Sequence, residues 1–283
     1  MHQSILVTGA SSGIGEATAI HLAHKGFRVF AAARRLEKLQ PLSGLGGGRI
    51  TPIAMDVTDE TSIANAFDEI AREGGVLYGL VNNAGVSVMG PIERVPLEEW
   101  RRQYETNVFG LVNVTRAFLP QMRMAGRGRI VNIGSVAGKI AAPFQGVYAS
   151  SKHAVEGLSD ALRRELAPHG VKVSVIRPGF INTPFGDQEQ EALGQYTSAG
   201  EPYAEQVRIF KAWHGRGHPN APSPMVVAEA VHHALTADRP NSRYTVPSKM
   251  LDALALRNLL PSAITDRIFE RATGLKDYKP ENE

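Results

Sequence analysis

The sequence predicts an α/β protein in which a doubly wound parallel sheet is covered by helices on both faces. Three observations carry this prediction. Short apolar runs alternate with helix-like stretches, a glycine-rich turn follows the first run, and 43% hydrophobic and 21% charged residues are typical of a globular protein. Right-handed crossovers between parallel strands then produce the doubly wound arrangement.

The alternation defines six strands in order along the chain. The expected strands cover residues 5–7, 27–33, 50–55, 76–81, 129–133 and 171–176. The first helix follows Gly15 and ends near Lys25, because Gly26 is favoured just beyond a helix C-terminus. An acidic first turn supports a helix over residues 59–72, and residues 148–167 form another helical stretch.

The regular alternation lapses over residues 184–224, where only residues 201–213 look helical. The apolar face of that helix carries Tyr203, Val207, Phe210 and Trp213. Long loops in compact domains are often functional, so we interpret the segment as a lid over a ligand. The alternative is an insertion whose apolar face simply packs on the core.

The expected organisation is one catalytic domain over residues 1–247, including the lid, and a helical extension over residues 248–283. The extension is amphipathic, with a break at Pro261, and we expect it to pack on the domain. The alternatives are packing against an oligomer partner and, if its polar face were more basic, binding at a membrane surface.

Composition excludes several classes of function. The formal net charge of +3 is small for 283 residues and argues against a nucleic-acid binder. The chain has no cysteine and no apolar run of membrane-spanning length, so we expect a cytoplasmic protein with neither disulfides nor a transmembrane segment.

No metal site is expected among the nine histidines. His232 and His233 are adjacent, so on a helix they would point about 100° apart. His214 and His218 are four residues apart, but the surrounding glycines and Pro219 argue against a helix there.

A glycine-rich turn joins the first strand to the first helix. It reads Thr8-Gly9-Ala10-Ser11-Ser12-Gly13-Ile14-Gly15. Glycines permit a tight turn and close backbone approach, and the helix N-terminus offers free N–H groups to a pyrophosphate. We therefore expect a dinucleotide-binding loop, although its spacing differs from the usual fingerprint; a plain structural connection is the alternative.

The end of the second strand indicates which dinucleotide is bound. Ala33 stands where an acidic side chain would hold the adenosine ribose hydroxyls, and Arg34 and Arg35 follow it. Guanidinium groups bind phosphate bidentately, so this end suits the 2′-phosphate of NADP(H). The alternative is a solvated basic helix start, which is unfavourable without a nearby anion.

Tyr148 and Lys152 lie one helical turn apart. A phenol titrates near ~10 and is a poor base at neutral pH unless a cation stabilises its phenolate. The Lys152 ammonium is placed to do so, which would make Tyr148 a proton donor or acceptor for a substrate oxygen. Ser135 ends the fifth strand, at the sheet edge where doubly wound folds bind ligands.

Together, the motifs resemble those of the classical short-chain dehydrogenase/reductase family, in the family's order. The matching pieces are the glycine loop of residues 8–15, Asn82-Asn83-Ala84-Gly85, Asn107, Ser135, Tyr148-x-x-x-Lys152 and Arg177-Pro178-Gly179. The resemblance covers residues 3–183, with weaker likeness through a seventh strand near Tyr244. It implies a Rossmann fold that binds a nicotinamide dinucleotide.

The resemblance also implies roles for four catalytic side chains. Tyr148 would be the general acid in carbonyl reduction and the general base in alcohol oxidation, and Ser135 would orient the reacting oxygen. Lys152 would bind the nicotinamide ribose and favour the Tyr148 phenolate. Asn107 would help hold a water that links Lys152 to solvent.

The implied cofactor contacts extend around the carboxyl edge of the sheet. Asp56 and Val57 would lie against the adenine, and Thr183 near the nicotinamide carboxamide or a phosphate. With the catalytic pair, the full set is Gly9, Ser11, Ser12, Gly13, Ile14, Gly15, Arg34, Arg35, Asp56, Val57, Asn83, Ala84, Gly85, Tyr148, Lys152, Pro178, Gly179, Ile181 and Thr183.

These features predict an NADP(H)-dependent oxidoreductase that interconverts a carbonyl and an alcohol on an apolar, bulky substrate of hydroxysteroid or retinol type. The residues expected at the substrate are Ser135, Tyr148, Phe144, Phe180, Phe185 and Phe210. Two alternatives stay open, a 3-oxoacyl-carrier-protein reductase and a non-catalytic NADPH-binding regulatory protein. The resemblance further implies a homodimer or homotetramer, associating through residues 97–119 and 148–167.

Overall fold

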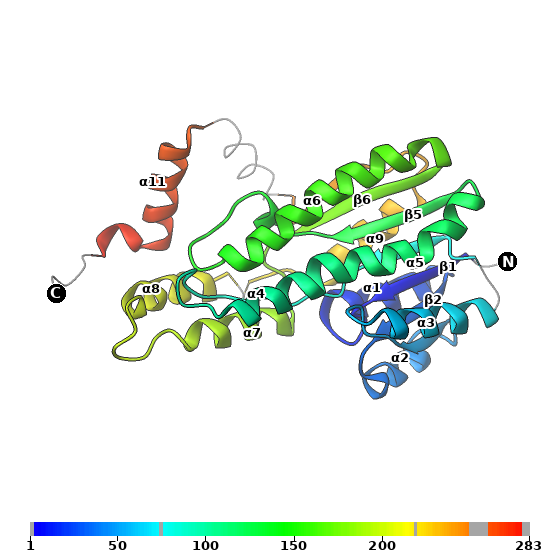
Figure 1. Cartoon of the computed structure of the whole chain (residues 1–283), viewed down its shortest axis with the longest axis horizontal. Helices are drawn as coiled ribbons and strands as arrows, with labels where there is room; N and C mark the ends of the chain where they lie inside the picture. Colours follow the sequence, from blue (N-terminus) through cyan, green and yellow to red (C-terminus); the bar gives the residue numbers. More distant parts are fainter. Residues whose placement is uncertain (1–2, 74–75, 218–219, 249–259, 279–283) are drawn as a thin grey trace.

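Seven parallel strands form one sheet in the order β3-β2-β1-β4-β5-β6-β7 (Figure 1). The computed structural model describes residues 3–73, 76–217, 220–248 and 260–278. Each strand pairs in parallel with its neighbours, which confirms the predicted doubly wound sheet. The strands are β1 (Ser4–Thr8), β2 (Arg28–Ala33), β3 (Ile50–Ala54), β4 (Gly79–Asn82), β5 (Gly128–Ile133), β6 (Val171–Pro178) and β7 (Arg243–Val246).

Helices cover both faces of the sheet. One core cluster includes residues of α1 (Gly13–His24), α2 (Gln40–Leu45) and α9 (Met225–Thr236). The second includes residues of α3 (Glu60–Arg72), α5 (Gly110–Met124) and α6 (Gly146–Leu166). Alternate side chains of a strand point to opposite faces, so Ile5 and Val7 of β1 enter the first cluster and Leu6 the second.

Local signals set two of the helix boundaries. Asp59 caps α3, because its Oδ1 accepts hydrogen bonds from the N–H groups of Thr61 and Ser62 at 2.8 and 3.2 Å. Gly26 follows α1 with φ of 92°, a left-handed conformation that glycine adopts without strain. Both helices therefore lie close to their predicted positions.

The helices α8 (Ala204–Gly215) and α11 (Ser262–Thr273) lie at one end of the molecule, and α7 (Pro184–Gly194) lies nearer its middle and contacts α8 (Figure 1). The sequence did not predict α7, because its glycines and polar residues hide the short apolar face around Leu193. The predicted lid helix of residues 201–213 is observed as α8, which includes His214 and ends at Gly215, so Arg216 and Gly217 lie in a turn beyond the helix. His218 and residues 249–259, which belong to the predicted extension, lie outside the described residues.

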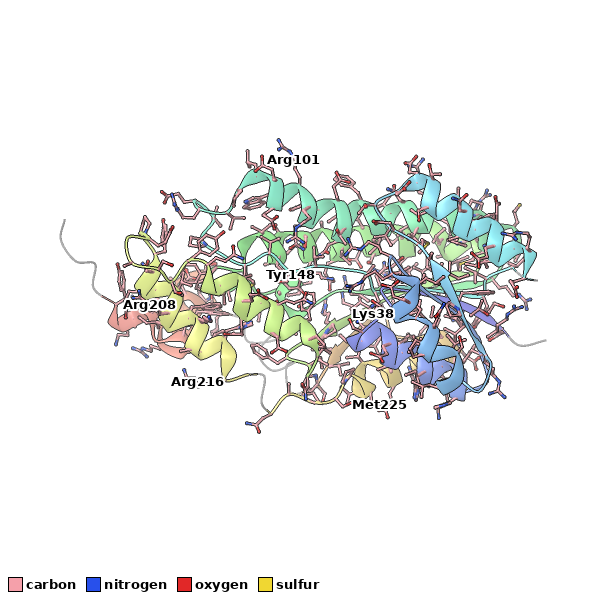
Figure 2. The ribbon with its side chains drawn as sticks, turned by 90° about the horizontal axis from the view of Figure 1, so that it is seen from below. Lys38, Arg101, Tyr148, Arg208, Arg216 and Met225 are labelled. Atoms are coloured by element: carbon pink, nitrogen blue, oxygen red, sulfur yellow. The ribbon has the colours of Figure 1, made fainter. Side chains whose placement is uncertain are left out.

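Polar side chains cover the outside of this fold. Figure 2 shows Arg101, Arg208 and Arg216 extending from the outline of the molecule, whereas Tyr148 is 8% exposed and lies within it. In the described part of the chain, no helix combines the length and the apolar character needed to cross a membrane.

Candidate active site

A cavity of about 980 Å³ opens at the carboxyl ends of the strands. Its walls come from the loops after β1, β2, β3, β4, β5 and β6, and from α7, α8 and α11. The strand order reverses between β1 and β4, and doubly wound folds bind ligands at such a switch point. The segment interpreted as a lid therefore borders the cavity through α7 and the end of α8.

The glycine-rich loop lines the cavity where it leads into the N-terminus of α1. Gly9 has φ of 64°, and a Cβ there would lie 2.7 Å from the Cα of Ala84. A Cβ on Gly15 would lie 2.3 Å from the carbonyl oxygen of Gly9, so both positions require glycine. Ser12, the N-cap residue, makes no side-chain capping bond, and the first N–H groups of α1 suit a pyrophosphate.

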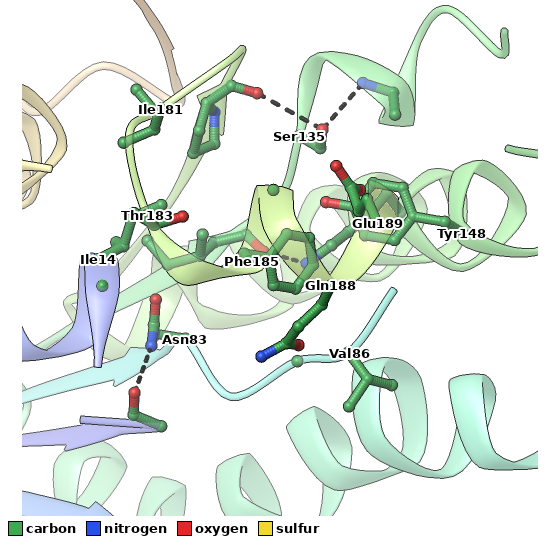
Figure 3. A pocket seen from close by; sticks show the side chains of 18 of the residues that line it. Ile14, Asn83, Val86, Ser135, Tyr148, Ile181, Thr183, Phe185, Gln188 and Glu189 are labelled. Atoms are coloured by element: carbon green, nitrogen blue, oxygen red, sulfur yellow. Dashed lines mark hydrogen bonds between the residues drawn. The ribbon is translucent and has the colours of Figure 1, made fainter. Parts of the chain in front are cut away.

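Asn83 and Thr8 fix the position of this loop. The Asn83 Nδ2 donates to the carbonyl oxygens of Thr8 and Gly9 at 2.9 and 3.1 Å (Figure 3). The Thr8 hydroxyl accepts hydrogen bonds from the N–H groups of Asn83 and Ala84, both at 3.0 Å. The first and fourth strands are thus joined where a dinucleotide would lie.

The end of the cavity next to the loop after β2 is basic. Arg34 and Arg35 line it beside Ala33, and among the described residues neither guanidinium has a carboxylate ion-pair partner. Asp56 and Val57 lie on the same wall, and Asp56 Oδ1 is held by the N–H and hydroxyl groups of Thr58 at 2.9 and 2.8 Å. These residues fit a nucleotide that carries an extra phosphate.

Tyr148 and Lys152 enter the cavity from the first two turns of α6. Burial, and secondarily the negative charge of Glu189, raises the pKa of Tyr148, while a hydrogen bond with Ser135 opposes this shift. Burial lowers the pKa of Lys152 to about 8. Burial therefore favours the protonated phenol. The expected role of Lys152 in favouring the phenolate stays a prediction.

Ser135 lies opposite Tyr148 at the end of β5 (Figure 3). Its Oγ accepts a hydrogen bond from the N–H of Ala137 at 3.0 Å and donates to the carbonyl oxygen of Pro178 at 3.5 Å. These bonds orient the hydroxyl beside the phenol, so two oxygen atoms are available to one substrate oxygen.

Asn107 supports the site from behind the cavity wall. It lies in a π-helical turn, Glu105–Phe109, which separates α4 (Leu97–Tyr104) from α5. Its Oδ1 accepts a hydrogen bond from the N–H of Val86 at 2.8 Å. Its Nδ2 donates to the carbonyl oxygen of Val86 at 3.0 Å and to Ser151 Oγ at 3.3 Å. Its contact with a bound water stays a prediction.

The remaining predicted residues divide into two groups. Most of the predicted cofactor residues, together with Phe180 and Phe185, line the cavity. Phe144 and Phe210 do not: Phe210 is fully buried and lies 5.5 Å from the ring of Phe144 in a separate apolar cluster. Most of the predicted apolar face of the lid helix packs there against Met89 and Leu193, and Trp213 at its end also lines the cavity.

Sequence reasoning missed Glu189 and His214 in the cavity wall. Glu189 Oε1 accepts a hydrogen bond from Ser87 Oγ at 2.9 Å, and Oε2 lies 3.5 Å from His214 Nε2. Burial raises the pKa of Glu189 to about 7, although the Ser87 bond opposes the shift. The described residues contain no group of three or more His, Asp or Glu side chains placed to hold a metal ion.

The C-terminal helix α11 also contributes to the cavity wall. The residues it provides are Thr265, Ile268, Phe269 and Ala272. Two of these side chains, Ile268 and Phe269, are large and apolar, so they give the cavity wall a surface suited to hydrocarbon.

Comparisons with known proteins agree with this geometry. A family model described as short chain dehydrogenase matches residues 3–194. The chain is 40% identical over 203 residues to 3-ketodihydrosphingosine reductase of Bacteroides thetaiotaomicron, covering 72% of each chain. It is 37% identical over 276 residues to NADPH-dependent 3-dehydrocapnine reductase of Ornithobacterium rhinotracheale, covering 93% of this chain and 95% of the relative. A solved short-chain dehydrogenase from Streptomyces avermitilis superposes with a TM-score of 0.79 at 29% identity, covering 98% of both chains.

Proposed function

Because the chain belongs to the short-chain dehydrogenase family, whose members act on CH–OH and C=O groups, we propose that it is an NADPH-dependent reductase of a large, apolar carbonyl compound. The observation that carries the proposal is the position of Tyr148 and Ser135. Both lie in one cavity between a basic dinucleotide end and an apolar wall.

The side chains have complementary tasks in this reaction. Ser135 and Tyr148 hydrogen-bond the carbonyl oxygen, and the protonated phenol donates its proton to that oxygen as the alcohol forms. Bound NADPH supplies the hydride that the carbonyl carbon receives. Lys152, with its pKa near 8, is mostly charged at neutral pH and stabilises the phenolate that proton donation leaves.

NADPH is the preferred cofactor in this proposal. Arg34 and Arg35 offer guanidinium groups at the adenosine end, and Ala33 provides no carboxylate that would repel a 2′-phosphate. The relative whose name describes it as NADPH-dependent supports the same choice.

The substrate carries a long apolar group. The apolar part of the cavity wall supports a long apolar group. It is lined by Phe185 of α7 and by Ile268 and Phe269 of α11. The ring of Phe185 lies 5.9 Å from the ring of Tyr148. The relatives named as reductases of 3-ketodihydrosphingosine and 3-dehydrocapnine also support a keto substrate.

A series of unbranched 2-ketones tests the size and character of the substrate. Each additional CH₂ group that the wall buries is expected to raise kcat/KM roughly fourfold, until the cavity is filled. Phe269→Ala should lower kcat/KM for the long ketones and leave kcat/KM for the four-carbon ketone unchanged. Asp266→Ala, an exposed position on the same helix outside the cavity, serves as the control. Equal rates for all chain lengths would contradict the proposed substrate class.

We also propose a homo-oligomer. Leu97 and Phe109 are 65% and 50% exposed on the helical segment that the family resemblance implies for association. Burial of such side chains against a second copy would stabilise an assembly. Light scattering coupled to size exclusion should give at least a dimer, and a monomer would contradict the proposal.

A further inference from the structure

Glu189 brings a buried carboxylate into the substrate part of the cavity. Its side chain is 9% exposed and lies on α7 beside Tyr148 (Figure 3). The carboxylate is close enough for its charge to raise the pKa of the Tyr148 phenol. The carbonyl oxygen in the proposed reaction binds at that phenol, so Glu189 lines the same part of the cavity as the reacting end of the substrate would.

The surroundings of Glu189 compensate its charge only partly. Ser87 supplies one hydroxyl donor at 2.9 Å, and His214 lies 3.5 Å away. Within the described residues, no lysine or arginine forms an ion pair with this carboxylate. A buried carboxylate is destabilising unless a cation or several donors compensate it, and burial accordingly raises the pKa of Glu189 to about 7.

His214 is a cation only when it is protonated, so a ligand cation would add a permanent positive charge to this arrangement. A protonated amine brings a full positive charge and three N–H donors, whereas a hydroxyl group brings one donor and no charge. The attraction is stronger inside a cavity than in water because the local dielectric constant is lower. The same carboxylate repels a substrate acid, so it discriminates against short keto acids.

We propose that Glu189 is a specificity-determining residue that binds a protonated amino group of the substrate. The substrate class is then a long-chain ketone that carries an amine next to the carbonyl, and the product is the corresponding amino alcohol. This inference rests on the proposed carbonyl reduction and adds the polar group to its apolar substrate.

A matched pair of ketones tests the inference with NADPH as reductant. 2-Amino-3-octadecanone and 3-octadecanone differ only in the amine. We expect the unaltered enzyme to have a kcat/KM roughly ten- to a hundredfold higher for the amino ketone, the range of a hydrogen bond to a charged group. Glu189→Gln should remove this preference mainly by raising KM for the amino ketone.

Two further variants separate recognition from structure. Glu191→Gln removes the same charge from an exposed position of the same helix and should keep the preference. Glu189→Asp keeps the negative charge, so it should retain part of the preference for the amino ketone. If Glu189→Gln does not fold, Glu189→Asp still tests the role of this side chain. An equal loss on both ketones in Glu189→Gln, or no preference in the unaltered enzyme, would overturn the inference.

A binding measurement distinguishes this inference from the proposed function. If the enzyme reduces neither ketone, the proposed function fails, and the cation site is still tested by calorimetry on the NADPH complex. Decylammonium should bind about tenfold or more tightly than decanol to the unaltered protein and equally to Glu189→Gln. Equal binding of the two probes to the unaltered protein would overturn the cation site itself.

Discussion

The Lys152 ammonium lies 5.8 Å from the centre of the Tyr148 ring, one turn further along α6. Lys152 Nζ also donates a hydrogen bond to the carbonyl oxygen of Ile133 at 2.8 Å, which anchors the cation to the end of β5. The ammonium is therefore held near the phenol without pairing with it. Burial raises the pKa of Tyr148 and favours the protonated phenol, and the ammonium is a nearby cation for the phenolate that the proposed reaction would produce.

Arg34→Ala should change cofactor preference. Loss of a charged hydrogen-bond donor to a 2′-phosphate is expected to weaken NADPH binding roughly ten- to a hundredfold and to leave NADH binding nearly unchanged. Titration of the protein with each dinucleotide measures the two dissociation constants. Lys38→Ala, a nearby exposed cation that does not line the cavity, is the control. Equal losses for both dinucleotides would refute the assignment of Arg34 to the phosphate.

Glu156→Ala should destabilise the fold behind the active site. The Glu156 side chain is 3% exposed and binds Arg177 through two hydrogen bonds of 2.5 and 2.7 Å, and Arg243 at 3.1 Å. Removing the carboxylate leaves a buried guanidinium uncompensated, which costs about 3–5 kcal/mol of unfolding free energy. Denaturant unfolding measures the loss. Glu165→Ala, at an exposed position of the same helix, should change it by less than about 0.5 kcal/mol.

Glu189 should make the stability of the protein depend on pH. Its pKa is about 7 in the folded protein against 4.5 for the unperturbed group, so the folded state binds more protons between these values. The unfolding free energy therefore falls as pH rises from 4.5 through 7, by up to about 3 kcal/mol from this group.

Glu189→Gln should remove that contribution. As pH rises from 4.5 to 7.5, the unfolding free energy of Glu189→Gln should increase relative to that of the unaltered protein. The unfolding free energy of Glu191→Gln relative to the unaltered protein should stay the same over this range. His214 and Tyr148 are the nearest titratable neighbours and are unchanged in both variants. A difference that is the same at both pH values would show that the carboxylate titrates normally.

Features that depend on neighbouring residues in the chain were predictable from the sequence. These features include the glycine loop, the strand that precedes it and the Tyr148–Lys152 spacing. Each depends only on residues that are close together in the sequence, so backbone geometry permits few arrangements. Ser135 was predictable because parallel strands end at a common edge of the sheet. The catalytic and cofactor roles of these residues stay predictions.

Features that depend on packing between distant segments were not predictable. Glu189 and its partner Ser87 are 102 positions apart, and an acidic residue on a polar helix resembles a solvated one until the fold buries it. Periodicity revealed the apolar face of α8 but not what that face contacts, so Phe210 was expected at the cavity and instead lies fully buried in a separate cluster.

The most direct test of the central claim is NADPH oxidation, followed optically, with a panel of aliphatic, aryl and steroidal ketones and acetoacetyl thioesters. Tyr148→Phe removes the proton donor and little else, so it should still bind NADPH while turnover of the best ketone falls by at least about a hundredfold. Turnover of a long-chain ketone that survives in Tyr148→Phe would contradict the assignment of Tyr148 as the proton donor.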